Sequence, residues 1–222
     1  MLDDDAVVPS GLRHERFVLT PLTMDTAALD YASYMASPDV IRVHSDGRWP
    51  VQGFTFSEDL ELVAQHEADH KSRRSFAFVL IAPSGAEALG CLYFNPLREY
   101  LSRAEAPRHL VDKTPFDSAM VTFWLRQDQQ NTDLAEIVVE TVNEWIIDEW
   151  PLAEHHFRVL PAERSSCAAL DRLSLRKVCL ALSGDERPYI WYQSSSGINR
   201  PRPSAHRQDR ADPAWSGEAE RG

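Results

Sequence analysis

The 222-residue sequence predicts an α/β (α+β) fold in which helices flank a central sheet. The first observation is an apolar run, residues 119–125, that is followed by a polar turn. From Leu134 onward apolar residues recur at helical spacing until the proline at position 151, which is the pattern of an amphipathic helix. The second observation is a pair of apolar segments, 75–82 and 88–97, separated by a Pro-Ser-Gly turn, which predicts two antiparallel strands.

The segments before these strands predict one strand and three helices. Their boundaries come from alternating apolar residues for the strand and from capping residues for the helices. In chain order we expect a disordered acidic stretch over 1–11, a strand over 15–22, a helix capped by Thr23, a short helix over 40–43 and a helix from Ser57 to about Arg73.

The last of these helices contains His66-Glu67-Ala68-Asp69-His70, a literal H-E-x-x-H. In zinc proteases this spacing places two imidazoles on one helix face, with the glutamate as base. The protease pattern has uncharged residues between the glutamate and the second histidine, whereas Asp69 is charged. We therefore favour a solvated helix face, expect no metal, and keep a zinc hydrolase as the third-ranked function.

The second half of the chain continues the alternation of strands and helices. We expect a long charged loop over 98–117, a strand over about 119–126, a helix from about 134 to 150, a strand over about 155–160, a helix within 162–176, and closing strands over 179–183 and 188–193. The folded domain would then span residues 12–193. The Arg/Pro/Ser-rich composition of 194–222 predicts a disordered tail.

Charge and composition exclude several classes of function. The formal net charge is −11, so nucleic acid and anionic membrane surfaces are not expected partners, whereas a cationic or amine-bearing substrate would be attracted. The three cysteines form no C-x-x-C pair, which argues against a disulfide framework or a zinc knuckle. No apolar run approaches the ~20 residues of a membrane span, and no secretory signal is recognisable at the start, so we expect a cytoplasmic protein.

The turn after residue 125 resembles that of the GCN5-related N-acetyltransferases, in which a strand runs into a Q/R-x-x-G-x-G/A sequence. Here it reads Gln130-Asn131-Thr132-Asp133-Leu134-Ala135, so the first and last positions match and Asp133 stands at the central glycine. A carboxylate there adds negative charge where a phosphate would bind. Asp133 and Glu136 also form a capping-box pattern, so we expect Asp133 to cap the helix.

A second segment resembles the family's N-x-x-S/A loop and the helix that follows. Ser166 matches the serine, and Glu163 stands at the usual asparagine. Leu170 stands where many members have a tyrosine general acid, and Ser174 replaces a glycine at the helix end.

The resemblance implies a fold and a cofactor. It implies a central mixed, mostly antiparallel sheet in which the strands at about 119–126 and 155–160 splay apart. It also implies acetyl-CoA, or another acyl-CoA, as co-substrate, with its pantetheine arm in the gap and its pyrophosphate on the turn amides. The implied cofactor-binding residues are Phe123, Trp124, Leu125, Gln130, Asn131, Thr132, Asp133, Leu134, Ala135 and Ser166.

Acetyl transfer to an amine needs a base and a donor for the developing oxyanion. His156 and Tyr93 are the candidate catalytic side chains, and the backbone N–H of Leu125 or a neighbour is the candidate oxyanion donor.

The favoured function is an acyl-CoA-dependent N-acetyltransferase that acts on an amine of a small molecule or peptide. The alternative, motivated by the departures at Asp133, Glu163, Leu170 and Ser174, is a catalytically silent binding or regulatory module with the same fold. A homodimer is left open.

Overall fold

The computed structural model describes residues 1–222 except 46, 50–52, 174, 181, 185–186 and 195–222. In the described part, the strands are β1 Leu12–His14, β2 Phe17–Pro21, β3 Phe76–Ile81, β4 Ala88–Pro96, β5 Ser118–Leu125, β6 Glu154–Val159, β7 Arg176–Val178 and β8 Ile190–Gln193. The helices are α1 Ala27–Met35, α2 Pro38–His44, α3 Phe56–Lys71, α4 Leu97–Arg103, α5 Arg108–Lys113, α6 Leu134–Glu149 and α7 Arg164–Arg172, with a 3-10 turn at Gln127–Gln129.

The strands form one eight-stranded sheet in the order β1-β2-β3-β4-β5-β6-β8-β7. Neighbouring strands are antiparallel except β5 and β6, which are parallel. This parallel pair is joined through α6, as a parallel connection requires. The predicted fold class, a mixed and mostly antiparallel sheet flanked by helices, is confirmed.

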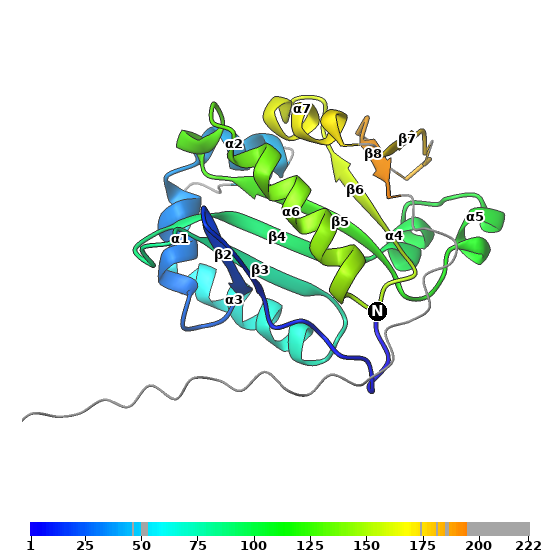
Figure 1. The fold of residues 1–222 in the computed structure, drawn as a ribbon, viewed down its shortest axis with the longest axis horizontal. Helices are drawn as coiled ribbons and strands as arrows, with labels where there is room; N and C mark the ends of the chain where they lie inside the picture. Colours follow the sequence, from blue (N-terminus) through cyan, green and yellow to red (C-terminus); the bar gives the residue numbers. More distant parts are fainter. Residues whose placement is uncertain (46, 50–52, 174, 181, 185–186, 195–222) are drawn as a thin grey trace, which may run out of the picture.

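Alternating side chains of the central strands divide the core into two layers. Phe94 on β4 and Phe123 on β5 pack with Val138 of α6 on one face of the sheet. Their neighbours Cys91 and Trp124 belong to the opposite face, where α1, α2 and α3 contribute apolar residues. Figure 1 shows α6 crossing β4 and β5, with α1 and α3 at the other side of the sheet. The two faces of β5 are therefore both covered, which explains its continuous apolar sequence.

The amino-terminal prediction of disorder over 1–11 is wrong at its start. Met1 and Leu2 are buried in the core cluster on the α6 face, and the terminal amino group donates to the carbonyl of Arg73 at 3.0 Å. The acidic composition of this stretch did not reveal that its first two apolar residues cover an open edge of the core.

Three local predictions also differ from the structure. Residues 98–117, expected to be a loop, contain α4 and α5, because Leu97 and Leu101 lie one turn apart and are buried together. The helix predicted to start at Ser57 is capped two residues earlier, where Thr55 and Glu58 form a complete capping box. The cap of the first helix is Thr26 rather than Thr23.

The first closing strand lies earlier than predicted, and the second begins two residues later but ends at the predicted residue. The strand expected over 179–183 is found at Arg176–Val178, and its partner occupies Ile190–Gln193. Ser174, residues 185–186 and the predicted tail of 194–222 lie outside the described residues, except that Ser194 is described and buried, with its N–H donating to the carbonyl of His155 at 3.2 Å. Among the described residues, no helix has the length and apolarity needed to cross a membrane.

Candidate functional site

The parallel strands β5 and β6 pair over only part of their length. Their register runs from Ser118 opposite Glu154 to Val121 opposite Phe157, and no later pair follows. β5 continues to Leu125 without a strand on that edge, whereas β6 pairs with β8 on its other side. Figure 1 shows the two strands diverging toward their carboxyl ends, as the predicted splay requires.

The backbone direction of β5 at this divergence follows from one hydrogen bond. The N–H of Arg126 donates to the carbonyl of Leu89, next to β4, at 2.7 Å. Because peptide groups alternate along a strand, the N–H and C=O groups of Phe123 and Leu125 point the other way, toward β6. β5 therefore presents unpaired backbone donors to the space between the strands.

The side chains of Phe123, Trp124 and Leu125 do not provide that surface. Phe123 and Leu125 are buried with α6, and Trp124 is buried on the opposite face, where its indole N–H donates to the Tyr93 hydroxyl at 3.3 Å. What this segment offers to a ligand between the strands is consequently its backbone.

The loop after β5 closes on itself and leaves several amides free. The side-chain amide of Gln130 donates to the carbonyl of Leu125 at 2.7 Å, and the Thr132 hydroxyl accepts from the N–H of Leu134 at 3.2 Å. Among the described residues, the N–H groups of Asn131, Ala135 and Glu136 have no hydrogen-bond acceptor. Unpaired amides at a helix start, combined with the helix dipole, favour an anion.

Asp133 lies at the N-cap position of α6, but its carboxylate makes no capping hydrogen bond, so that part of the prediction is wrong. The carboxylate instead forms a two-pronged pair with Arg16 of the β1–β2 turn, at 3.1 and 3.3 Å. The Arg16 guanidinium lowers the pKa of Asp133. Glu136 is paired with Arg172 of α7. Each carboxylate near the free amides is therefore neutralised by an arginine.

Ser165 and Ser166 begin α7 beside this loop. Ser166, the predicted contact, is buried in the first turn of the helix. Its neighbour Ser165, which was not predicted, donates through its hydroxyl to the carbonyl of Gln130 and so ties α7 to the loop after β5.

Glu163 and His44 are in hydrogen-bonding contact. The His44 Nδ1 atom lies 2.8 Å from one Glu163 carboxylate oxygen, and the other oxygen accepts from the N–H of Leu160 at 2.6 Å. Both side chains are largely buried, with 24% and 11% exposure. The pair joins the end of α2 to the segment that follows β6. The two residues are 119 positions apart, so no local sequence pattern reveals their contact.

The two predicted catalytic side chains are both enclosed. His156 is buried on β6, and its Nε2 atom lies 3.8 Å from Glu154, beyond ordinary hydrogen-bond distance. Tyr93 packs against His66 and accepts the Trp124 N–H, and burial raises the pKa of its hydroxyl. The neighbouring His155 bonds Asn143 at 2.9 Å, and burial lowers its pKa to about 3, so it is a neutral structural residue.

The H-E-x-x-H segment is only partly solvated in the described structure, so the prediction of a wholly solvated face is wrong. His66 packs against Tyr93, and His70 packs against Phe76 and Phe78 at ring distances of 5.0 and 5.3 Å. No group of three or more metal-binding side chains is found in the described part of the chain. The geometry therefore gives no support to the zinc-hydrolase alternative.

Two buried acids, Asp30 of α1 and Asp59 of α3, lie on the Trp124 face of the sheet. Asp30 accepts the Cys91 thiol at 2.9 Å, and Asp59 has one carboxylate oxygen with no partner among the described residues. Burial raises the pKa of both acids, and the charge of Asp30 contributes to raising the pKa of Asp59 to about 7.

Asp59 predicts a pH-dependent stability. Because its folded pKa exceeds its ordinary value of 3.8, the unfolded chain loses this proton first, and stability falls as pH rises from about 4 to about 7. The stability advantage of Asp59→Asn over the wild type should therefore grow between pH 5 and pH 8 by roughly 2–3 kcal/mol, since the wild type loses about 1.4 kcal/mol per pH unit up to its folded pKa of about 7. Thermal melts at both pH values, with exposed Asp25→Asn as control, measure this. An equal difference at both pH values would contradict it.

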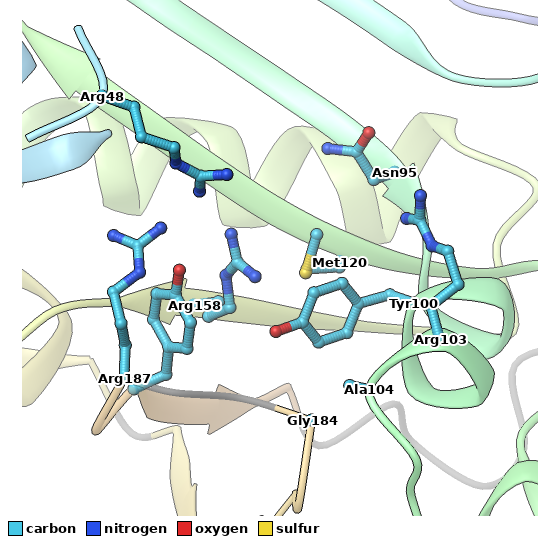
Figure 2. A pocket seen from close by; sticks show the side chains of 10 residues that line it. Arg48, Asn95, Tyr100, Arg103, Ala104, Met120, Arg158, Gly184 and Arg187 are labelled. Carbon is cyan, nitrogen blue, oxygen red and sulfur yellow. The ribbon is translucent and has the colours of Figure 1, made fainter. Parts of the chain in front are cut away.

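A cavity of about 570 Å³ lies on the sheet face opposite α6 (Figure 2). Its floor includes Asn95 of β4 and Met120 of β5, which are register partners. Arg158, the first residue of β6 beyond its last pair with β5, lines the side. The cavity therefore adjoins the level at which the strands part.

Comparison with known proteins was made by sequence and by structure. No protein-family model matches the sequence, and no curated protein matches it significantly. Solved structures do match. The ribosomal-protein-S5-alanine acetyltransferase from Vibrio fischeri superposes with a TM-score of 0.64 at 15% identity, over 87% of this chain and 100% of that one.

Two further matches were solved with the cofactor. The microcin C7 self-immunity acetyltransferase MccE, in complex with acetyl-CoA and AMP, has a TM-score of 0.62 at 14% identity, over 86% of this chain and 99% of that one. The ribosomal-protein acetyltransferase RimL, in complex with coenzyme A, has a TM-score of 0.61 at 13% identity, over 84% and 96%. Structural matches at identities this low show only a shared fold. The chain therefore has the fold of the GCN5-related N-acetyltransferase superfamily.

Proposed function

We propose that this chain is an acyl-CoA-dependent N-acetyltransferase that acts on an amine of a small molecule or peptide. The observation that carries the proposal is the unpaired edge of β5, which ends at a loop with three free amides in the described structure. A long thiol carrier with a pyrophosphate needs both features, one for its amide-containing arm and one for its charge. Similar structures bound to coenzyme A or acetyl-CoA add support.

The residues present fit such a cofactor through their backbone. Phe123 and Leu125 would pair with the arm, and the amides of Asn131 and Ala135 would face the pyrophosphate. The Asp133 carboxylate opposes an incoming anion, but its pairing with Arg16 offsets that charge. Because both side chains are about half exposed, the pair is weak and free to rearrange. Arg16 would then become a further donor to the anion.

Acetyl-CoA, when bound, supplies the acetyl group as a thioester. The N–H of Leu125 or Phe123 donates to the carbonyl oxygen as negative charge develops on it. A base takes one proton from the acceptor amine as the N–C bond forms. The C–S bond breaks, and the leaving thiolate takes up a proton. The reaction does not require a proton-donating side chain at position 170, where this chain has a leucine, since a thiolate is a stable leaving group.

We assign the base to His44 rather than to His156 or Tyr93. Glu163 holds the Nδ1 side of the His44 ring, which leaves Nε2 as the proton acceptor. His44 retains 24% exposure beside the diverging strands, whereas His156 is buried on β6 where the strands still pair. The tyrosine hydroxyl at 93 already accepts the Trp124 N–H.

Calorimetric titration with acetyl-CoA tests the proposed function directly. We expect stoichiometric binding with Kd in the micromolar range, and slow hydrolytic or acceptor-dependent release of free thiol. Pantetheine, which keeps the thiol arm but lacks the pyrophosphate and nucleotide, should bind more weakly. An absence of binding at millimolar acetyl-CoA would remove the assignment.

The same titration on Asp133→Gly distinguishes the proposed enzyme from the alternative, a catalytically silent binding module. If the wild type does not bind and the variant binds, the carboxylate has disabled the site and the chain is a binding module with this fold. If both bind and the wild type turns over, the Arg16–Asp133 pair is a compatible substitute for the usual glycine. Asp128→Gly, which removes a carboxylate from the same loop outside the helix start, controls for general loop flexibility.

A further inference from the structure

The cavity on the face opposite α6 is lined by arginines from four separate parts of the chain (Figure 2). Arg48 follows α2, Arg103 ends α4, Arg158 lies on β6, and Arg187 precedes β8. No acidic side chain is among the described residues that line the cavity. Because the whole chain carries a formal net charge of −11, this concentration of positive charge runs against its average composition.

Three of these arginines lack a carboxylate partner in the described part of the structure. No ion pair within 4.0 Å joins Arg48, Arg103 or Arg158 to a described acid, whereas Arg126 pairs with both Glu87 and Asp128. Figure 2 shows the guanidinium groups of Arg48, Arg158 and Arg187 directed toward one space, with Arg103 beside Asn95 across from them. Like charges gathered in this way repel one another, and an anion between them would relieve the repulsion.

Aromatic rings hold Arg158 in place. Its guanidinium carbon lies 4.1 Å from the Tyr189 ring centroid and 4.7 Å from that of Tyr100, with Trp191 at 5.9 Å. Its Nε atom is buried and has no hydrogen-bond partner among the described residues. Stacking fixes the position of a guanidinium but does not neutralise it. The side chain is thus pre-organised for a ligand that the described protein does not supply.

We propose that this cavity binds the anionic part of the acceptor, so that the amine to be acetylated carries a carboxylate or phosphate near it. The inference rests on the proposed acetyltransferase function. Guanidinium forks bind both kinds of anion through paired N–H donors. The cavity adjoins Met120 and Arg158, at the level where β5 and β6 part, so an anion held there places its amine beside the proposed thioester position. The size of the cavity, about 570 Å³, suits a small molecule or the first few residues of a peptide.

Matched acceptors test this inference. The panel pairs O-phosphoethanolamine with ethanolamine, and a peptide starting Ser-Asp-Glu with its Ser-Asn-Gln counterpart, each assayed by thiol release from acetyl-CoA. We expect the anionic member of at least one pair to have a kcat/KM ten or more times that of its neutral partner. The pair that shows this preference tells whether the cavity favours a phosphate or a carboxylate. Equal rates within both pairs, or a preference for the neutral member, would overturn the inference.

Arginine variants locate the effect in the cavity. Arg48→Gln and Arg103→Gln change exposed side chains, so both variants should fold. Each should raise the KM of the anionic acceptor about tenfold and leave the KM of acetyl-CoA unchanged. Arg108→Gln, at a side chain that is 95% exposed and outside the cavity, is the matched control and should change neither value. If Arg48→Gln and Arg103→Gln behave like the control, the cavity does not select the acceptor.

The failure of this inference is distinguishable from the failure of the proposed function. Calorimetry of the wild type with acetyl-CoA alone tests the function, as described above. Calorimetry with O-phosphoethanolamine or the acidic peptide alone tests the cavity without turnover. Acetyl-CoA binding with no discrimination between anionic and neutral ligands overturns only the inference. Anion binding that Arg48→Gln and Arg103→Gln weaken, in a chain that does not bind acetyl-CoA, would leave a ligand site but remove the acceptor role.

Discussion

Gly90→Ala should lower the stability of this protein by about 3–5 kcal/mol, a combination of backbone strain and overpacking. Gly90 has φ near +151°, a conformation that side chains disfavour. A Cβ atom built there would lie 2.1 Å from the carbonyl oxygen of Trp124 and 2.9 Å from the Cα of Leu125. Both obstacles are backbone of β5, so neither can rotate away, and β4 and β5 would have to separate locally.

Thermal unfolding measures this effect, and Gly85→Ala is its control. Gly85 also has a positive φ, of 73°, but nothing lies within 4 Å of its built Cβ. Gly85→Ala should therefore lower the stability only through its unfavourable backbone conformation, by roughly 1 kcal/mol. Because the displaced backbone is the proposed cofactor edge, Gly90→Ala should also weaken acetyl-CoA binding in any fraction that folds. Equal melting temperatures for the two variants would show that β5 tolerates the displacement.

His44→Ala should reduce kcat by a factor of about 10²–10⁴, the usual contribution of a general base. Glu163→Gln keeps a hydrogen-bonding side chain beside the ring and should reduce kcat less, since Glu163 acts through His44. Binding of acetyl-CoA by calorimetry should be unchanged in His44→Ala. The rate of the variant should also lose the limb of the pH profile that reports deprotonation of the base.

Two further histidine variants test the assignment of His44 as the base. His109→Ala removes an exposed histidine of α5 and should leave the rate and its pH profile at wild-type values. His156→Ala tests the rival base, which is buried with its Nε2 atom 3.8 Å from Glu154. If His156→Ala abolishes the pH-dependent limb while His44→Ala retains it, the base lies on β6 and the His44–Glu163 pair is structural.

The overall charge of the chain and the charge around the cavity have opposite signs. A net charge of −11 predicts attraction of a cationic or amine-bearing substrate. The cavity beside the diverging strands is instead lined by Arg48, Arg103, Arg158 and Arg187. A net charge sums over the whole surface, whereas a ligand responds mainly to charges within a Debye length, about 8–10 Å in physiological salt. The arrangement of four residues therefore outweighs the sum of many.

Predictions from the sequence were accurate where neighbouring residues determine the structure. The strand ending at Leu125 and the helix beginning at Leu134 were found within one or two residues of their predicted bounds. Periodicity identified both, because burial on one face repeats every 3.6 residues in a helix and a fully buried strand reads as a continuous apolar run. The errors at Ser57 and at residues 98–117 have the same origin, since weak local signals were judged without the core that they pack against.

The sequence by itself determined most of the strands and helices and the position of the loop between β5 and α6, and the resemblance to a known family added the mixed sheet. Only the tertiary structure decided which side chains meet around that loop. Arg16 pairs with Asp133, 117 positions away, and His44 bonds Glu163, 119 positions away. Four arginines from separate segments line one cavity. The physical reason is that local backbone preferences act over a few residues, whereas these contacts depend on how distant segments meet when the core is buried.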